Sequence, residues 1–395
     1  MTNKRNWLNS NVLAAGITSF LSDMSHEAVT VLLPSLLAIL NAPMYALGLI
    51  EGFSDGLASI AKVISGYYSD KFNKRKELST FGYFATGIFP AIVALSTSWY
   101  TILFARVFGW IGRGLRGPPR DAIIANSVAK KDLGKAFGFH RFADTSGAIL
   151  GPLIAVYLLS YVSIKDIILV ATIPGLIACF IFFIFVKDTL KIKKFDSKTL
   201  IASLEALPNN YKLFLLAILI FGLADFSHTL LIAFAISELA VSLSFVEAST
   251  LAISLYAMRN ISYALISYPS GLLGDKFGKK KVLLLGYLIG TITFLGFIIF
   301  PKNFFTFSIL FILSGAFIAF EDTLEAAAAS EFLERHKRSL GLGALAAVNG
   351  IGDMVSSIAF SFISSAYGYM YGFAYSFLLS ILGVLLLAYQ ILRTS

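Results

Sequence analysis

Gly66-Tyr-Tyr-Ser-Asp70-Lys-Phe-Asn-Lys-Arg-Lys76 is one of two copies of a segment in this chain, and the second is Gly271-Leu-Leu-Gly-Asp275-Lys-Phe-Gly-Lys-Lys-Lys281. In both copies an apolar stretch precedes the glycine and a basic cluster follows the aspartate. A second pair of matching segments, Asp23-Met-Ser-His26 and Asp225-Phe-Ser-His228, is separated by almost the same number of residues. Two repeats with nearly equal offsets predict a chain built as two halves of one design.

The composition places these halves in a lipid bilayer. Of the 395 residues, 57% are hydrophobic and only 14% are charged, a balance that excludes a water-soluble domain of this size. A bilayer core about 30 Å thick requires about 20 apolar residues per helical span, so twelve spans with short loops would occupy nearly the whole chain. We therefore expect an all-α membrane protein with twelve transmembrane helices in two pseudo-symmetric six-helix bundles.

The hydropathy pattern also predicts the limits of the spans and of the bundles. The first apolar stretch is too long for a signal peptide and contains charged residues, so we expect it to be retained as a helix. We expect an N-terminal bundle at 1–190, a cytoplasmic linker at 191–209 and a C-terminal bundle at 210–395. The expected spans lie near 11–40, 44–68, 77–97, 99–127, 133–161, 165–186, 211–240, 245–272, 282–300, 304–330, 339–366 and 369–391.

Basic residues are distributed unevenly between the loops. Most of the 32 lysines and arginines fall in segments that share one side of the bilayer with both termini, and the opposite loops hold only Lys165 and Lys302. The positive-inside rule therefore predicts cytoplasmic termini in a multi-pass protein of the cell (inner) membrane. This placement accounts for the net charge of +9 without a nucleic-acid partner. The single cysteine, Cys179, excludes an intramolecular disulfide.

The repeated segment resembles the signature loop of the major facilitator superfamily, in which a glycine, three residues and an aspartate are followed by a basic residue, a glycine and further basic residues. The first copy has Lys71 and Asn73 where that pattern has arginine and glycine, whereas the second copy keeps Gly278. The resemblance implies a secondary transporter that works by alternating access and is not an enzyme. It also implies a conformational latch at Gly66, Asp70, Gly271 and Asp275, in which each aspartate accepts from amides at the N-terminus of a neighbouring helix.

Two other segments resemble parts of the same superfamily. Gly147-Ala-Ile-Leu-Gly151-Pro152 is similar to a motif of its antiporters, drug exporters included, although Ala155-Val156 stands where that motif has two glycines. The stretch 112–121 resembles a prokaryotic, drug-exporter-like branch. These resemblances imply export by antiport. Ordinary packing explains the first segment equally well, because small residues four apart allow two helices to approach closely.

Charged side chains inside the first and seventh spans are the principal site candidates. A charge at mid-bilayer costs about 2.5 to 3.5 kcal/mol, so each one is a functional candidate. Asp23, His26 and Glu27 have the spacing that places them on one helix face, and Asp225 and His228 repeat part of this pattern. The resemblance implies that the two Asp-x-Ser-His elements face each other near the midplane of a central cavity. Alternatively, they hydrogen-bond within their own bundles and fix helix packing.

The fourth span adds basic candidates. Arg106 and Arg113 are seven residues apart and share a face, and Arg106 stands at the place of an arginine that the superfamily associates with proton coupling. Pro118-Pro119 is expected to break the register of this helix. Alternatively, Arg113 and Arg120 form structural ion pairs with Asp121, Asp144 or loop acids near the cytoplasmic face.

Acidic side chains outnumber basic ones inside the predicted spans. Carboxylates in a low-dielectric interior can load and release protons, and their surplus would attract a cation. We therefore expect proton-coupled export of a small amphipathic or cationic molecule by a monomer. A proton gradient would supply the energy, no cofactor is required, and the partners would be the substrate and the lipid bilayer.

Three alternatives remain open on the sequence. Asp23, His26, Asp225 and His228 offer ligands that suit Fe²⁺, Mn²⁺ or Zn²⁺, so the chain could be a divalent metal transporter. Arg106 and Arg113 could instead hold an anionic substrate, which the acid excess disfavours. The chain could also be a non-transporting membrane receptor on the same scaffold.

Overall fold

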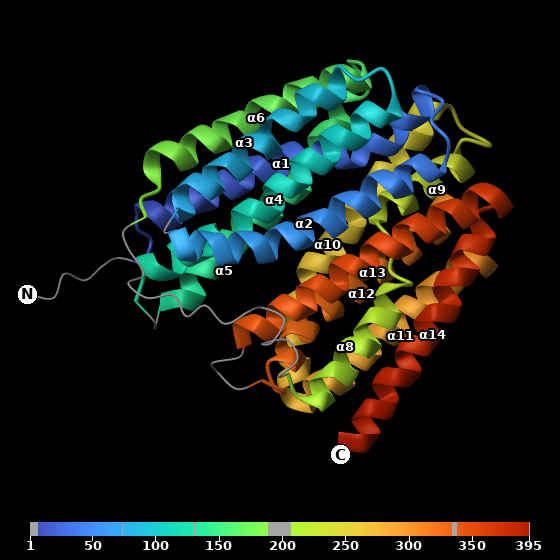
Figure 1. The fold of residues 1–395 in the computed structure, drawn as a ribbon. Coiled ribbons are helices and arrows are strands. Elements are labelled where there is room, and N and C mark those ends of the chain that lie inside the picture. Colours follow the sequence, from blue (N-terminus) through green and yellow to red (C-terminus); the bar gives the residue numbers. More distant parts are fainter. Residues whose placement is uncertain (1–6, 73, 130–131, 189–206, 334–337, 395) are drawn as a thin grey trace, which may run out of the picture. The chain divides into compact units, whose positions relative to one another are not determined.

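A computed structural model describes residues 7–72, 74–129, 132–188, 207–333 and 338–394. Over these residues the chain forms thirteen α-helices and no strands (Figure 1). The prediction of an all-α protein is therefore confirmed. The chain divides into two compact units, which are described separately. Unit 1 consists of Met1–Ala42 and Leu57–Asp196, and unit 2 consists of Pro43–Gly56 and Ser197–Ser395.

Unit 1 is organised around α1, which packs against α5 and α6, while α3 packs against α4 and α6. Polar side chains begin three of its helices: Asn9 accepts from backbone amides of α1, and Ser98 and Ser163 do the same for α4 and α6. These contacts satisfy amides that have no partner within the helix. The helices are α1 (Ser10–Ile39), α2 (Tyr45–Phe72), α3 (Arg75–Ala94), α4 (Trp99–Ser127), α5 (Leu133–Leu158) and α6 (Ile164–Phe185).

Unit 2 has an aromatic core, in which Phe221 stacks on Tyr287 with ring centroids 3.6 Å apart. Its helix α12 packs against α10 and α11, and α14 packs against α8 and α11. The helices are α8 (Asn209–Gly222), α9 (His228–Leu239), α10 (Phe245–Phe277), α11 (Lys279–Ile299), α12 (Phe304–Ala329), α13 (Arg338–Tyr367) and α14 (Tyr369–Thr394).

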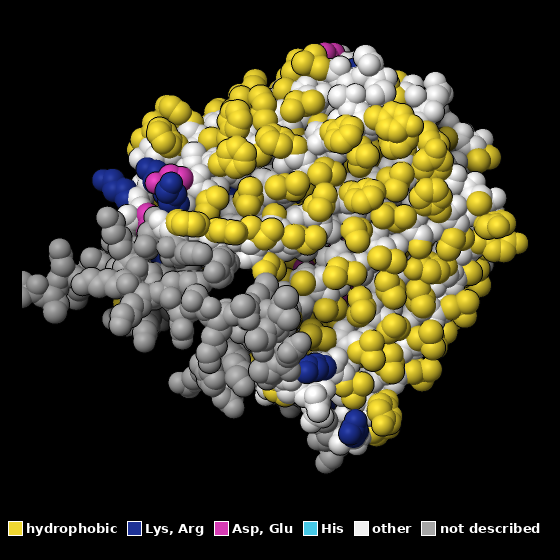
Figure 2. Space-filling model, viewed as in Figure 1, with side chains coloured by type: hydrophobic (Ala, Val, Ile, Leu, Met, Phe, Trp, Pro, Cys, Tyr) yellow, Lys and Arg dark blue, Asp and Glu magenta, His cyan; other side chains and the backbone are white. Residues whose placement is uncertain are grey.

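The outer surfaces of the helices are apolar. Five described helices, α6 and α11 to α14, are long and apolar enough by length and composition to cross a membrane. Large hydrophobic side chains such as Phe104 and Leu265 are 72% and 70% exposed. Figure 2 shows hydrophobic side chains over most of the described surface in this view, with lysine and arginine near helix ends. Such a surface is stable only in lipid.

The seventh predicted span, expected as one helix near 211–240, is interrupted. Helix α8 ends at Gly222 and α9 begins at His228, so Leu223–Ser227 lies outside both helices. The prediction of a continuous helix was wrong here. The hydropathy of the segment could not reveal the break, because side chains of another helix satisfy the freed backbone groups.

The expected break at Pro118-Pro119 was also wrong, because α4 continues through both prolines to Ser127. Proline at 119 removes the amide that would bond to the carbonyl of Leu115. The hydroxyl of Ser65 on α2 donates to that carbonyl at 2.5 Å instead. A neighbouring helix therefore supplies the missing hydrogen bond.

The units differ from the expected division of the chain at α2, whose first residues, 45–56, belong to unit 2. The backbone of α2 at Gly48 approaches Ser361 on α13 so closely that an added Cβ would overlap its side chain. Most of the expected linker at 191–209 lies outside the described residues. The division into an N-terminal bundle, a linker and a C-terminal bundle stays a prediction.

Helices α1 and α5 make a close contact through glycines. A Cβ added at Gly147 would overlap the carbonyl oxygen of Phe20, and one added at Gly151 would lie 2.5 Å from the carbonyl oxygen of Met24. Pro152 follows within α5. Neither glycine tolerates a side chain without movement of α1. The antiporter role that the resemblance implies for this motif stays a prediction.

Gly147→Ala should lower the stability of the protein by about 1 to 3 kcal/mol, the usual cost of overpacking. Gly138, also on α5, is the matched control, because a Cβ there would meet nothing within 4 Å. Gly138→Ala should raise stability by about 0.5 to 1 kcal/mol through helix propensity. Thermal unfolding of the detergent-purified protein, followed by tryptophan fluorescence, compares the two. Stabilisation by both changes would contradict the close contact.

Candidate functional site

The polar site of unit 1 begins with three neighbouring side chains of α1. His26 Nε2 lies 3.0 Å from Asp23 Oδ1, and His26 Nδ1 lies 3.6 Å from Glu27 Oε1. All three side chains are buried, His26 completely. Ser25 anchors this turn, because its hydroxyl donates to the carbonyl of Ala171 on α6 at 2.6 Å. The structure therefore brings together the three residues that the helical spacing placed on one face.

Arg116 of α4 is the ion-pair partner of Asp23. Its NH2 group lies 3.3 Å from Asp23 Oδ1, and its NH1 group donates to Thr86 Oγ1 at 3.1 Å and to Ser22 Oγ. The guanidinium carbon lies 4.4 Å from the ring centroid of Tyr83. Arg116 is only 2% exposed. A buried charge with several donors engaged in this way fixes α4 against α1 and α3.

Along α4, Trp110 lies between Arg106 and Arg113, and both guanidinium groups are near its ring. The guanidinium carbon of Arg106 is 3.4 Å from the Trp110 ring centroid, and that of Arg113 is 5.5 Å away. Arg106 NH1 also donates to Thr30 Oγ1 at 2.9 Å. The ring of His26 is 5.5 Å from that of Trp110. Cations over a desolvated indole are attracted by its negative face, so Trp110 organises the basic side chains on this face of α4.

The outer part of α4 carries separate ion pairs. Arg120 contacts Asp121 at 2.9 Å. Asp144 accepts from the hydroxyl of Ser19 at 2.5 Å and lies 3.6 Å from Arg141. These contacts connect α5 to α1. The expectation that the outer arginine takes part in structural ion pairs is confirmed for Arg120.

The polar site of unit 2 is built around the break between α8 and α9, which contains Asp225. Ser356 of α13 donates from its hydroxyl to the carbonyl of Asp225 at 2.5 Å. The amide of Ser227 donates to Ser357 Oγ at 2.9 Å. Gly352 lets α13 come this near, because a Cβ there would lie 3.0 Å from the backbone of Gly222 at the end of α8. Side chains of α13 thus replace the helical hydrogen bonds that the break removes.

Asp225 is partly buried beside a carboxyl group of α12. Its side chain is hydrogen-bonded to that of Glu321, and the charge of Arg259 on α10 acts on it. Arg259 is held in place by Ser314 Oγ, which accepts from its Nε at 3.1 Å. One turn along α12 lies a second carboxyl group, Glu325, which is 2% exposed.

Two donors from other helices hold Glu325. Tyr287 of α11 donates from its hydroxyl to Glu325 Oε1 at 2.5 Å, and Asn349 of α13 donates to Oε2 at 2.7 Å. Asp225, Glu321 and Glu325 therefore form a carboxyl cluster that joins α12 to the break and to α11 and α13. We call these three residues the carboxyl cluster.

His228 and Glu51 flank the break. His228 is the first residue of α9 and stacks on Tyr256 of α10, with ring centroids 4.8 Å apart. Glu51, from the part of α2 that belongs to unit 2, accepts from the hydroxyl of Ser227 at 3.2 Å. The structure therefore places Asp225 and His228 at the same break but gives them different neighbours.

The two Asp-x-Ser-His elements differ in conformation and in chemistry. In unit 1 the element lies within a continuous helix and Asp23 pairs with an arginine. In unit 2 it lies in a helix break and Asp225 pairs with a carboxyl group. The charges near the two elements also differ, because α4 contributes arginines in unit 1 and α12 contributes carboxyl groups in unit 2. The expectation that the two elements face each other stays a prediction.

The residues expected to form a conformational latch are placed only in part. Gly66 lies on α2 and Gly271 on α10, and the side chain of Asp70 lies outside the description. Asp275 is 72% exposed and lies 3.5 Å from Lys279, which also contacts Glu331 at 3.0 Å. Asp275 thus contacts a lysine at the start of α11, and the latch role stays a prediction.

The metal hypothesis required His and carboxylate ligands to converge. Across the described ranges, no group of three or more His, Cys, Asp or Glu side chains has a geometry that could hold a metal ion. Asp23 and His26 are close, but their other neighbours include the cation of Arg116. The predicted metal site at Asp23, His26, Asp225 and His228 therefore gains no support.

Sequence reasoning did not assign Glu321, Glu325 or Arg116 to the site. The cost of a charge in the bilayer was the signal that could have selected them. Their partners could not be read from the chain, because Arg116 and Asp23 are 93 positions apart and Glu325 takes its donors from two other helices.

The duplicated segments, the interrupted span and the ionisable side chains inside apolar helices are features of membrane transporters. The family model described as Major Facilitator Superfamily matches residues 15–258 and 214–394. The chain belongs to the major facilitator superfamily. The resemblance found in the repeated loop is thereby confirmed.

Relatives and solved structures agree with this assignment. An uncharacterised MFS-type transporter of Methanocaldococcus jannaschii is 34% identical over 96% of this chain and 95% of its own length. A multidrug resistance protein, MdtH, of Photorhabdus laumondii is 28% identical over 30% of this chain and 28% of its own. The nucleoside transporter NupG has the same fold, with a TM-score of 0.78, 15% identity and coverage of 98% of this chain and 99% of that one. The D-xylose-proton symporter also has this fold, with a TM-score of 0.72, 15% identity and coverage of 97% of each chain.

Asp23→Asn should destabilise the protein by about 3 to 5 kcal/mol, because it leaves the buried cation of Arg116 without its counter-charge. Asp121→Asn is the matched control. It also removes a carboxylate from an arginine of α4, but Asp121 is 46% exposed, so its loss should cost at most about 1 kcal/mol.

Thermal unfolding in detergent compares the two variants with wild type. A loss of stability in Asp23→Asn that is no larger than in Asp121→Asn would show that the Asp23 and Arg116 contact does not hold α1 to α4.

Proposed function

We propose that this protein is a proton-coupled exporter of small amphipathic or cationic molecules. The observation that carries the proposal is the hydrogen bond between the side chains of Asp225 and Glu321 at the break in the seventh span. Asp23, His26, Glu27, Arg106 and Arg113 are proposed to contact the substrate from unit 1, and His228 from unit 2.

The carboxyl pair has the chemistry of a proton site. An ionised carboxylate only accepts hydrogen bonds, so two carboxyl groups bonded to each other must share at least one proton. Release of that proton would leave two negative charges in contact inside a low-dielectric protein, which is unfavourable. A cation that arrives as the proton leaves would remove this repulsion. The pair therefore supports exchange of a proton for a cationic substrate.

The break supports a link between the proton and a conformational change. Leu223–Ser227 has no continuous helical hydrogen bonding, and Ser356 and Ser357 of α13 hold its backbone. Interrupted spans in transporters bind their substrates or ions at such points and bend there. A change of charge on Asp225 acts directly on this segment, because Asp225 is part of it.

Asp23 is less suited to exchange a proton than the carboxyl pair. Its carboxylate lies 3.3 Å from the buried guanidinium of Arg116. Removing one charge from a buried ion pair costs about 3 to 5 kcal/mol, which each transport cycle would have to supply. We therefore assign proton exchange to Asp225 with Glu321, and we keep Asp23 as a fixed counter-charge within the polar site of unit 1.

The named relatives favour export without deciding it. The multidrug resistance protein MdtH of Photorhabdus laumondii matches 117 residues of this chain at 28% identity, and the resemblance of the Gly147 motif to antiporters points the same way. We propose antiport on these grounds. The proposed setting is the cell membrane, with both termini cytoplasmic and a monomer as the working form.

Divalent metal transport and a receptor role are not carried forward. No arrangement among the described residues favours a metal cargo. A receptor would not need a shared proton at an interrupted span, whereas an exchanger does.

The proposal is tested in proteoliposomes with an acidic interior and ethidium as the cationic probe. Wild type should accumulate ethidium in response to the pH gradient, and a protonophore should abolish this. Asp225→Asn and Glu321→Gln should each lower the gradient-driven rate at least about a hundredfold, the lower end of the usual scale for loss of a proton-transferring group.

Asp322→Asn is the matched control, because Asp322 follows Glu321 on α12 but is exposed and accepts from the hydroxyl of Tyr263 at 3.0 Å. It should retain most of the rate. An unchanged gradient-driven rate in Asp225→Asn and Glu321→Gln would refute the proton role of the pair. Absence of gradient-driven ethidium uptake by wild type would refute the substrate class.

A further inference from the structure

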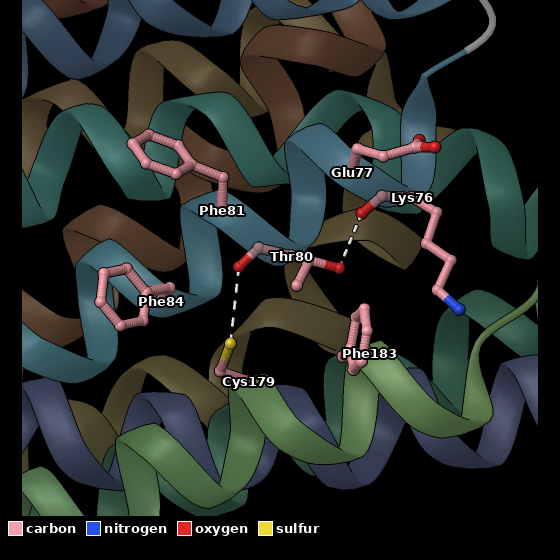
Figure 3. A pocket seen from close by; sticks show the side chains of 7 residues that line it. All are labelled: Lys76, Glu77, Thr80, Phe81, Phe84, Cys179 and Phe183. Atoms are coloured by element: carbon pink, nitrogen blue, oxygen red, sulfur yellow. Dashed lines mark hydrogen bonds between the residues drawn. The ribbon is translucent and has the colours of Figure 1, made fainter.

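A groove lies between α3 and α6 on the outside of unit 1, with a cavity volume of about 580 Å³. Figure 3 shows it from close by, with Phe81 and Phe84 on α3 toward one end and Lys76 and Glu77 at the other. Cys179 and Phe183 of α6 form the opposite wall. The groove belongs to neither polar site, so its occupant is independent of the proposed function.

The walls of the groove are apolar and open. The exposed fractions of Phe81, Phe84 and Phe183 are 49%, 46% and 59%. Beneath them α3 and α6 are in firm contact through Tyr83 and Phe182, whose ring centroids are 4.9 Å apart. Aromatic rings exposed on a membrane-spanning helix face hydrocarbon. An acyl chain is therefore the occupant that suits this part of the groove.

At the other end of the groove, Lys76 is the basic side chain among the residues that line it. The ammonium of Lys76 lies 5.4 Å from the ring centroid of Phe183, so the side chain reaches from α3 to α6. The hydroxyl of Thr80 donates to the carbonyl of Lys76 at 2.8 Å, and the carbonyl of Thr80 accepts from Cys179 Sγ at 3.6 Å. Thr80 is thus occupied within the protein and offers little to a ligand.

The neighbouring charges make this end basic. Arg75 turns inward, is 2% exposed and lies 3.8 Å from Asp188, so it is not presented to the groove. Lys74 and Lys187, at the adjoining ends of α3 and α6, are exposed. The carboxylate of Glu77 points away from Lys76 in Figure 3. A headgroup at this end therefore meets mainly positive charge.

We propose that the groove is a binding site for an anionic phospholipid. Its acyl chain would lie along Phe81, Phe84 and Phe183, and its phosphate would meet the ammonium of Lys76. Basic side chains beside a membrane-spanning helix attract anionic headgroups, and the apolar walls accept the chain. A lipid bound in this way contacts α3 and α6 together and so stabilises their packing.

The second half of the chain offers a built-in comparison. Lys281 occupies in the second repeat the position of Lys76 in the first, and it lies in the first turn of α11 as Lys76 lies in the first turn of α3. Leu285, Gly286 and Ile289 occupy the positions of Thr80, Phe81 and Phe84. At Gly286 the helix packs so closely on Phe320 of α12 that even a Cβ would overlap it. Lys281 therefore serves as a control for Lys76, because it lies at the equivalent position of the repeat but the phenylalanines that line the groove are absent there.

The test uses the full chain, purified in detergent and stripped of lipid. Phosphatidylglycerol, phosphatidylethanolamine and phosphatidylcholine with identical acyl chains are added, and bound lipid is counted by native mass spectrometry. Wild type should retain phosphatidylglycerol in preference to both other lipids. Lys76→Gln should weaken phosphatidylglycerol binding about fivefold, the scale of one basic residue at a membrane surface. Lys76→Arg and Lys281→Gln should bind as wild type does.

Two further measurements locate the lipid. Glu77→Gln should strengthen phosphatidylglycerol binding, because it removes a negative charge from the rim of the groove. Cys179 is the single cysteine of the chain, so its maleimide labelling reports on the groove. Phosphatidylglycerol should slow this labelling in wild type and have little effect in Lys76→Gln.

Several outcomes would overturn the proposal. Equal retention of the three lipids would show that the groove does not select an anionic headgroup. Preference for phosphatidylethanolamine, with weaker binding in Glu77→Gln, would assign the groove to a zwitterionic headgroup instead. Equal effects of Lys76→Gln and Lys281→Gln would show only general attraction of lipid to basic helix ends.

Discussion

The ion pair between Asp23 and Arg116 is the interaction on which the interior of unit 1 depends. Charge in a low-dielectric interior is tolerated only with a partner and with its remaining donors satisfied. Arg116 meets both conditions through Asp23, Thr86 and Ser22, and these contacts set how α4 lies against α1 and α3. The polar face of α1, with His26 and Glu27, and the arginines around Trp110 are positioned by the same packing.

Unit 2 meets the same constraint by a different route. The charges around its break are mainly carboxyl groups, and the side chain of Asp225 is hydrogen-bonded to that of Glu321, while the charge of Arg259 also acts on it. The break between α8 and α9 places Asp225 there, and serine side chains of α13 satisfy the backbone that the break exposes. The same tetrapeptide pattern therefore lies beside an arginine in one half of the chain and beside a carboxyl group, in a helix break, in the other. In the proposed function, this difference separates a fixed counter-charge in unit 1 from the site that would exchange the proton in unit 2.

On the membrane-facing surface, charged side chains are also stable only where they can be solvated or paired. Lysine and arginine lie near helix ends in the view of Figure 2, and Phe81, Phe84 and Phe183 line the groove between α3 and α6 in Figure 3. Lys76 stands where these two features meet, with its ammonium 5.4 Å from the ring of Phe183. A lipid at that point would act on α3 directly after the repeated loop, whereas Lys281 in the second half lies on a helix that packs tightly on Phe320.

The sequence by itself determined the class of fold, the family and the residues on the polar face of α1. Composition, a duplicated loop and helical spacing are local or periodic features, so they can be recognised without knowledge of tertiary contacts. Only the tertiary structure decided that Asp23 pairs with Arg116, that Glu321 joins Asp225, that the seventh span is interrupted and that α4 continues through Pro118 and Pro119. In each case the deciding group lies on another helix: Arg116 is 93 positions from Asp23, and Ser65, which donates to Leu115, is 50 positions from it. A proline or a break in a helix leaves backbone groups without a hydrogen bond, and these groups are tolerated only where a neighbouring helix supplies one. Tertiary packing alone decides which helix is that neighbour.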